Sequence, residues 1–202
     1  MRAILTMLVL AATLAGCASG ARLGEKQDLG TFRLGHNVVV ATNATKGPFS
    51  RDASAEELQA ALSGEIDRRF SRYDGDKFFH LGISIDGYIL ALPGIPLVAS
   101  PKSALIISVR VWDDAAGVKL TEEPHQITVL ESFSGETMVG SGLTRSKEEQ
   151  LQNLVQNAAL AVEKYLASHP EWFQPDPAAE GEEVAAAAEA PEAAQTAPRP
   201  RP

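Results

Sequence analysis

The feature that most constrains the fold is a long central segment in which apolar and polar residues alternate. Apolar side chains recur at every second position: Phe79, Leu81, Ile83 and Ile85. This period of two predicts a β-strand with one buried face, and Gly87 predicts a bulge, after which Tyr88, Leu90 and Leu92 continue the alternation in the other phase. Residues 104–112 repeat the pattern. The middle of the chain is therefore expected to form a sheet.

Two helices are predicted on either side of this segment. Each is opened by an S-x-x-E capping box, Ser54 with Glu57 and Ser146 with Glu149. Apolar residues at helical spacing follow each box, which predicts helices at about 55–73 and from 147 to the His169-Pro170 stop. Further strands are expected at 32–42, 118–120 and 125–133.

The order of these elements is β-α-β-β-β-α. An antiparallel sheet with both helices packed on one face would bury both apolar helix stripes at once. The sequence therefore predicts an α+β fold, a two-layer sandwich of about 140 residues. A domain of that size buries a sizeable core without disulfides or metals.

The N-terminus reads as a secretory signal. Arg2 precedes an apolar run from Ile4 to Leu14, which is too short to span a bilayer but suits a signal peptide. The run leads to Leu14-Ala15-Gly16-Cys17, and Cys17 is the one cysteine in the chain. This segment resembles the lipobox of bacterial lipoproteins. The resemblance implies cleavage between Gly16 and Cys17, diacylglyceryl attachment to the Cys17 sulfur and acylation of the new amino group. An ordinary signal peptide cut near Ala18 is the alternative.

These signals divide the chain into four parts. Residues 1–16 are expected to be the signal peptide, 17–30 a lipidated tether, 31–173 the periplasmic domain, and 174–202 a disordered tail rich in alanine, proline and glutamate. By the same resemblance, Ala18 after the cysteine implies sorting to the outer membrane, where the domain would face the periplasm. The membrane is then a partner through the lipid on Cys17.

Composition and motifs exclude several function classes. The net charge of −8 argues against a nucleic-acid partner, which requires a basic face. The four histidines, His36, His80, His125 and His169, are scattered and fit no metal-ligand spacing. Nucleophile and phosphate-loop motifs are missing from the sequence. We therefore expect no enzyme activity, no metal site and no cofactor other than the covalent lipid.

One loop is unusually apolar for a connection between strands. Residues 92–101 contain three prolines, and the apolar members are Leu92, Ile95, Leu97 and Val98. Prolines prevent this segment from joining a sheet, and loops are normally polar. Two interpretations remain open: the loop covers the end of the core, or it contacts a protein partner or a lipid.

Two weaker candidates concern anions. Gly140 and Gly142 precede a helix N-terminus and Arg145 adds a positive charge, which indicates either a phosphate site or a flexible connector. Arg68, Arg69 and Arg72 gather near the end of the first helix. They predict either a solvated face or a patch for anionic headgroups.

Together these features predict a non-enzymatic, membrane-anchored lipoprotein of the cell envelope that acts as an accessory or interaction component of an assembly or transport system with an envelope protein as partner. The element order is similar in layout to small α+β domains of outer-membrane assembly lipoproteins, without a shared motif. The alternative is a lipid- or glycolipid-binding periplasmic module, with the loop around residues 95–98 lining an apolar groove.

Overall fold

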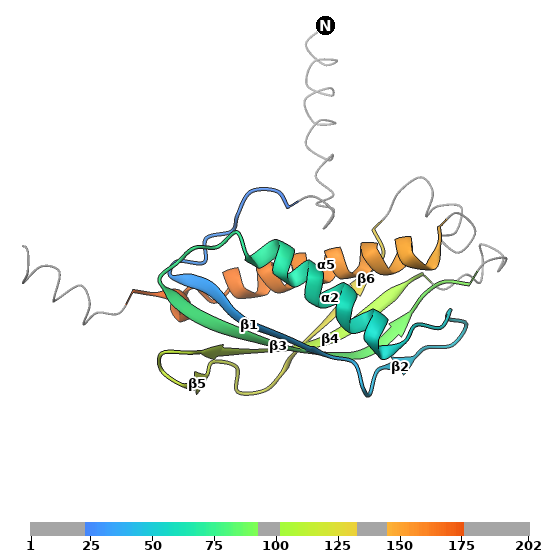
Figure 1. Ribbon diagram of the computed structural model, residues 1–202, viewed down its shortest axis with the longest axis horizontal. Coiled ribbons are helices and arrows are strands. Elements are labelled where there is room, and N and C mark those ends of the chain that lie inside the picture. The colour runs from blue at the N-terminus through green and yellow to red at the C-terminus, as the bar shows by residue number, and fades with distance from the viewer. Residues whose placement is uncertain (1–22, 93–101, 133–144, 176–202) are drawn as a thin grey trace, which may run out of the picture.

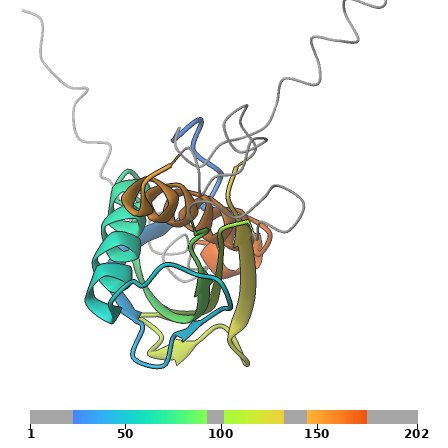
Figure 2. The ribbon, with the colours of Figure 1, turned by 90° about the vertical axis from the view of Figure 1, so that its right-hand side faces the viewer.

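The computed structural model describes residues 23–92, 102–132 and 145–175, which form two layers (Figure 1). One layer is a sheet in which six strands are described, and the other contains the helices α2 (Ala55–Phe70) and α5 (Lys147–Ala167). A short 3-10 helix, η1 (Pro170–Phe173), follows α5. Both long helices lie on the same side of the sheet, as the turned view also shows (Figure 2). The predicted α+β sandwich is confirmed.

The centre of the sheet is an antiparallel pair of long strands, β3 (Lys77–Ile89) and β4 (Ala104–Asp113). On the far side of β3, β1 (Phe32–Val40) and β2 (Thr45–Lys46) pair with it one after the other. On the far side of β4, β5 (Val118–Lys119) and β6 (His125–Leu130) do the same. The register of β3 against β4 shifts between Ile85 and Gly87, which confirms the predicted bulge.

The sheet is mixed, so the expectation of a purely antiparallel sheet is wrong. β1 and β2 run parallel to β3, whereas β3, β4, β5 and β6 are joined by antiparallel pairings. The reason is that α2 lies between both of these strands and β3 in the chain. A crossover helix returns the chain to the end of the sheet where the first strand began, and this makes the two strands parallel.

Both helices begin where the capping boxes predict. The Ser54 hydroxyl accepts from the Glu57 N–H while the Glu57 carboxylate accepts from the Ser54 N–H, and Ser146 and Glu149 repeat the arrangement. α2 ends at Phe70, three residues before the expected Tyr73. Tyr73 instead turns its side chain into the protein, where it is 8% exposed. Tyr73 thus contributes to the core from the turn that follows the helix.

The core lies between the helix layer and the inner face of the sheet. Phe79, Leu81, Ile83 and Ile85 of β3 and the apolar phase of β4 point inward and are almost fully buried. Leu62 and Ile66 of α2 and Leu154 and Val162 of α5 meet them from the other layer. Each fully buried side chain of this size stabilises the fold by about 1.5–3 kcal/mol. The alternation seen in the sequence is thus the alternation between core and open face.

Candidate functional site

The face of the sheet turned away from the helices carries an exposed aliphatic strip and two hollows. Val38 and Val40, on the outward phase of β1, are 56% and 44% exposed. Residues from β1, β3 and β4 surround the two hollows, which share Val38, Gly82 and Trp112. We call this surface the open face.

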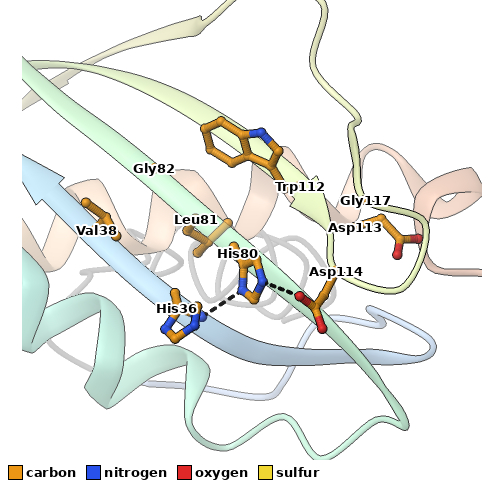
Figure 3. Close-up of a pocket in the computed structure, with 9 residues that line it drawn as sticks. All are labelled: His36, Val38, His80, Leu81, Gly82, Trp112, Asp113, Asp114 and Gly117. Carbon is orange, nitrogen blue, oxygen red and sulfur yellow. Dashed lines mark hydrogen bonds and ion pairs between the residues drawn. The ribbon is translucent and has the colours of Figure 1, made fainter.

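The first hollow has a volume of about 510 Å³ and is drawn in Figure 3. Its functional side chains are contributed by β1, by β3 and by β4 with the turn that follows: His36, His80, Trp112, Asp113 and Asp114. We call it the Trp112 hollow. In Figure 3 the indole of Trp112 lies across the outer face of the sheet with its ring plane turned toward the viewer, and both aspartates lie at the end where β4 turns.

Gly82 creates the space that the indole occupies. A Cβ atom at this position would lie 2.7 Å from the Cζ3 atom of Trp112 and 3.0 Å from its Cη2 atom. Gly82 faces Arg110 on β4, two positions from Trp112, so the indole leans diagonally over the neighbouring strand. Aromatic rings commonly cover glycines of adjacent strands in this way. The indole is thus positioned by a missing side chain on β3.

His80 is held between two partners in a single tautomer. Its Nδ1 accepts from the backbone N–H of His36 at 2.9 Å, so the proton is on Nε2, which lies 2.8 Å from Oδ1 of Asp114. Gly35 permits this approach, because a Cβ there would lie 2.5 Å from Nδ1 of His80. These two hydrogen bonds of His80 orient its imidazole and the Asp114 carboxylate at the rim of the Trp112 hollow (Figure 3).

The second hollow lies on the other side of Trp112 and has a volume of about 420 Å³. Its main polar feature is Asp86, whose Oδ1 and Oδ2 accept from the hydroxyls of Ser84 and Ser108 at 2.9 and 2.6 Å. Arg110 also lines this hollow. Both carboxylate oxygens of Asp86 are thus engaged with neighbouring strand residues.

The lining of the Trp112 hollow offers groups that can bind a ligand. Of the nine residues that line the Trp112 hollow, none is a serine, threonine, cysteine or lysine that would act as a nucleophile beside His80 and Asp114. Among the residues that the structure describes, no three His, Cys, Asp or Glu side chains gather as a metal site would require. The face of the Trp112 ring, the oriented imidazole of His80 and the two carboxylates suit recognition of a ligand group.

A buried ion cluster joins the two helices on the other side of the molecule. Glu163 of α5 accepts from Nη1 of Arg69 at 2.8 Å, and the two side chains are 1% and 0% exposed. Arg72 and the hydroxyl of Tyr73 donate to the other oxygen of the same carboxylate. Burial and the neighbouring carboxylate raise the pKa of Tyr73 well above its ordinary value. We call these four residues the Glu163 cluster.

The Glu163 cluster also holds the segment that follows the predicted anchor. Arg69 Nη1 donates to the Leu23 carbonyl at 3.4 Å, and Arg72 Nη1 donates to the Gly24 carbonyl at 3.0 Å. The Gln27 N–H donates to the Tyr73 hydroxyl at 3.0 Å, and Lys26 Nζ donates to the Arg72 carbonyl at 2.8 Å. The second half of the expected tether therefore contacts the body. Both ribbon views place it on the helix side of the sheet (Figures 1 and 2).

The three arginines of α2 do not form the basic patch or solvated face expected from the sequence. Arg69 is fully buried against Glu163, and Arg72 is 17% exposed and paired with the same residue. Arg68 pairs with the carboxylate of Glu65, which is itself buried. Internal carboxylates thus compensate all three charges.

The other residues singled out in the sequence are only partly within the described ranges. Leu92 is half-buried at the end of the β3 segment, whereas Ile95, Leu97 and Val98 lie outside the described residues. Gly16, Cys17, Gly140 and Gly142 also lie outside them. Arg145 donates from Nη1 to Oε1 of Glu131 at 3.0 Å. An anion at the predicted glycine site would therefore share Arg145 with a buried carboxylate.

The Trp112 hollow was not predicted from the sequence, although one signal was available. Trp112 stands on the outward phase of a strand whose inward phase is aliphatic from Leu105 to Val111. A large aromatic residue on an outward phase indicates a surface with a binding role more often than an exposed valine does. Asp113 and Asp114 stand where β4 ends and the chain turns, and the Ala116 N–H donates to Asp113 Oδ1 in that turn.

No helix in the described parts of the chain combines the length and the apolar character needed to cross a membrane.

Comparisons with known proteins give partial structural likenesses. No protein-family model and no curated protein sequence matches the chain. A candidate lipoprotein from Caulobacter crescentus is similar in structure, with 13% identity and a TM-score of 0.38 over 69% of this chain and 93% of the other. A hypothetical protein from Chlamydia trachomatis is 13% identical, with a TM-score of 0.42 over 67% of this chain and 98% of the other. A protein from Xanthomonas campestris is 11% identical, with a TM-score of 0.40 over 72% of this chain and 92% of the other.

Proposed function

We propose that this chain is a lipid-anchored lipoprotein of the bacterial cell envelope, held at the outer membrane and facing the periplasm, that works by binding an envelope protein and not by catalysis. The lipobox-like segment ending at Cys17 supports the anchor. The open face with its two hollows supports a binding role.

The observation that carries the proposal is the position of the N-terminal segment, which the Glu163 cluster holds, relative to the open face. Leu23 and Gly24 are held by the Glu163 cluster on the helix side. Only six residue steps separate Cys17 from Leu23, and a fully extended chain of that length reaches about 21 Å. A lipid on Cys17 would therefore keep the helix side toward the membrane. The open face would point into the periplasm, where a protein partner could reach it.

The anchor can be tested on one peptide. Trypsin cleavage after Arg22 releases residues 17–22 of the mature chain, and mass spectrometry of this peptide reports its acylation. We expect a diacylglyceryl group on Cys17 and an acyl chain on its amino group. An unmodified N-terminus, or a chain that begins at another residue, would contradict the proposal. The Cys17→Ala variant is the control, and it should leave membranes after a high-salt wash.

The binding role can be tested by purifying the tagged, lipidated protein from detergent-solubilised envelopes and identifying both proteins and lipids. We expect a stoichiometric protein partner that is lost in a Trp112→Ala variant with normal lipidation. A Leu97→Asp variant examines the apolar loop in the same way. Lipid retained without any protein would favour a lipid-binding module and contradict the proposed role.

A further inference from the structure

The Trp112 hollow combines an aromatic face with negative charge. Asp113 and Asp114 both line it, whereas Arg110 lines the second hollow and Lys119 pairs with Trp112 from β5. In the described structure, Oδ1 of Asp113 accepts from the Ala116 N–H, and Oδ1 of Asp114 accepts from Nε2 of His80. The side chain of Asp114 is 56% exposed. The hollow therefore offers carboxylate oxygens beside an indole.

This pairing of groups selects for a cation. The face of an indole attracts a positive charge more strongly than other aromatic side chains do, and arginine is the usual partner. A guanidinium is planar, so it can stack on an aromatic ring, and its N–H groups can donate to a carboxylate that lines the same hollow. The His80 Nε2–H bond fixes the orientation of the Asp114 carboxylate before any ligand arrives. A planar cation fits this arrangement better than a compact ammonium does.

The surroundings indicate that the cation belongs to a protein. The hollow continues past Trp112 into the second hollow, and Val38 and Val40 extend the apolar surface along β1. A longer segment with apolar side chains next to its arginine would cover this strip. The open face also lies opposite the segment held by the Glu163 cluster, so lipid headgroups at the anchor would be on the other side (Figures 1 and 2).

We propose that the Trp112 hollow binds an arginine side chain of an envelope protein, stacked on Trp112 and paired with Asp114 and Asp113. The choice of a protein as the source of the arginine rests on the proposed function. The recognition of the guanidinium itself rests only on the geometry of the hollow.

The test uses the full mature lipidated chain in detergent micelles, labelled with 5-fluorotryptophan. Only Trp112 and Trp172 give fluorine signals, and a Trp172→Phe variant assigns them. The probe is acetyl-Val-Arg-Val-amide, and acetyl-Val-Gln-Val-amide is the uncharged control. We expect the arginine peptide to shift the Trp112 signal and to leave Trp172 in place. Lack of a Trp112 shift up to the solubility limit of the peptide would overturn the proposal.

Matched variants separate a specific site from general attraction to an acidic protein. Asp114→Asn should weaken binding of the arginine peptide by about three- to fivefold, as expected for loss of one exposed ion pair. Asp86→Asn changes the net charge equally on the same face but in the second hollow, and it should change binding less than about twofold. Equal effects of the two variants would overturn the proposal. Asp113→Asn repeats the test if Asp114→Asn fails to fold.

Two further results distinguish the sources of the cation. Choline chloride tests for a lipid headgroup, and a Trp112 shift with choline but not with the arginine peptide would overturn the assignment to a protein. Absence of lipid on the tryptic peptide of residues 17–22 would contradict the proposed anchor while leaving the fluorine result unaffected. The two proposals can therefore fail independently.

Discussion

Arg69 and Glu163 are 94 positions apart in the sequence, yet they form an ion pair from which solvent is almost completely excluded. The pair joins the last turn of α2 to the last turns of α5. Burying two charges costs considerable free energy, and the cost is recovered only where further hydrogen bonds satisfy the remaining polar atoms. Here Arg72, Tyr73 and the carbonyl of Leu23 supply such bonds. Stability and the position of the N-terminal segment thus depend on one carboxylate.

Removing this carboxylate charge should be costly. We expect Glu163→Gln to lower the free energy of unfolding by about 3 kcal/mol, because it removes the carboxylate charge that pairs with the buried Arg69 guanidinium. Chemical denaturation monitored by circular dichroism measures this change. Lys164→Gln, at the next and exposed position of α5, is the control and should change stability by less than about 0.5 kcal/mol. Hydrogen exchange at the Gln27 amide should also accelerate in Glu163→Gln, and unchanged exchange would show that the N-terminal segment is held by other contacts.

Two glycine substitutions should have opposite effects. Gly82→Ala places a methyl group 2.7 Å from the Trp112 ring, so the indole must move off β3. We expect a loss of up to about 1 kcal/mol and a change in Trp112 fluorescence. Gly64→Ala lies in α2, where nothing is within 4 Å of the new methyl group, and it should stabilise by about 0.5–1 kcal/mol. Unchanged Trp112 fluorescence in the Gly82→Ala variant would contradict the described position of the indole over Gly82.

Acid should weaken the fold through His125. Its imidazole is stacked on Tyr165 with ring centres 3.8 Å apart. Partial burial and then the charge of nearby His169 lower the pKa of His125 below its ordinary value of 6.5. The folded state therefore binds this proton less readily than the unfolded state, and the stability contributed by His125 is present above pH 6.5 and lost as pH falls through the folded pKa.

An NMR titration of the His125 ring protons measures the shift directly. His169→Gln removes the like charge and should raise the pKa of His125 toward 6.5. A pKa at or above 6.5 in the unsubstituted protein would contradict the described stack. His125→Gln should also make the melting temperature less dependent on pH below neutrality.

Alkali should act through Tyr73. Burial, followed by the bond to Glu163, raises the pKa of the Tyr73 phenol above its ordinary value of 10.0. The unfolded state then loses the proton first, so the contribution of Tyr73 to stability is present below pH 10 and is lost as pH rises further. Tyr73→Phe should reduce the loss of stability on going from pH 9 to pH 11. Phenolate absorbance measures the same event, and full ionisation of Tyr73 in the folded protein near pH 10 would contradict the prediction.

The fold was largely predictable because its determinants are local. The two capping boxes fix where α2 and α5 begin, and the alternation around Ile83 and Val109 fixes which side of the sheet is buried. The parallel pairing of β1 with β3 was missed even though α2 between them implies it. The element order by itself is compatible with an antiparallel sheet, but a helix that connects two neighbouring strands makes them parallel.

The candidate site was not predictable in the same way, since it is assembled from distant segments. His36, His80 and Asp114 belong to β1, β3 and the turn after β4, and only the pairing of the strands brings them together. The arginines of α2 show the converse. Their clustering in the sequence indicated a surface patch, but the partner that neutralises Arg69 and Arg72 lies more than 90 positions away. Long-range ion pairs leave no local pattern in a sequence.

A side chain from each long helix also hydrogen-bonds a backbone carbonyl of an outer strand of the sheet. The side-chain amide of Gln59 donates to the Val39 carbonyl on β1 at 3.1 Å, and that of Asn157 donates to the Leu130 carbonyl on β6 at 3.0 Å. Unsatisfied strand edges invite other strands to add to a sheet, and aggregation follows from the same chemistry. At these two carbonyls, side chains of the molecule itself take the place of an incoming strand. Addition of a foreign strand is therefore disfavoured at these two carbonyls, because each already accepts a hydrogen bond.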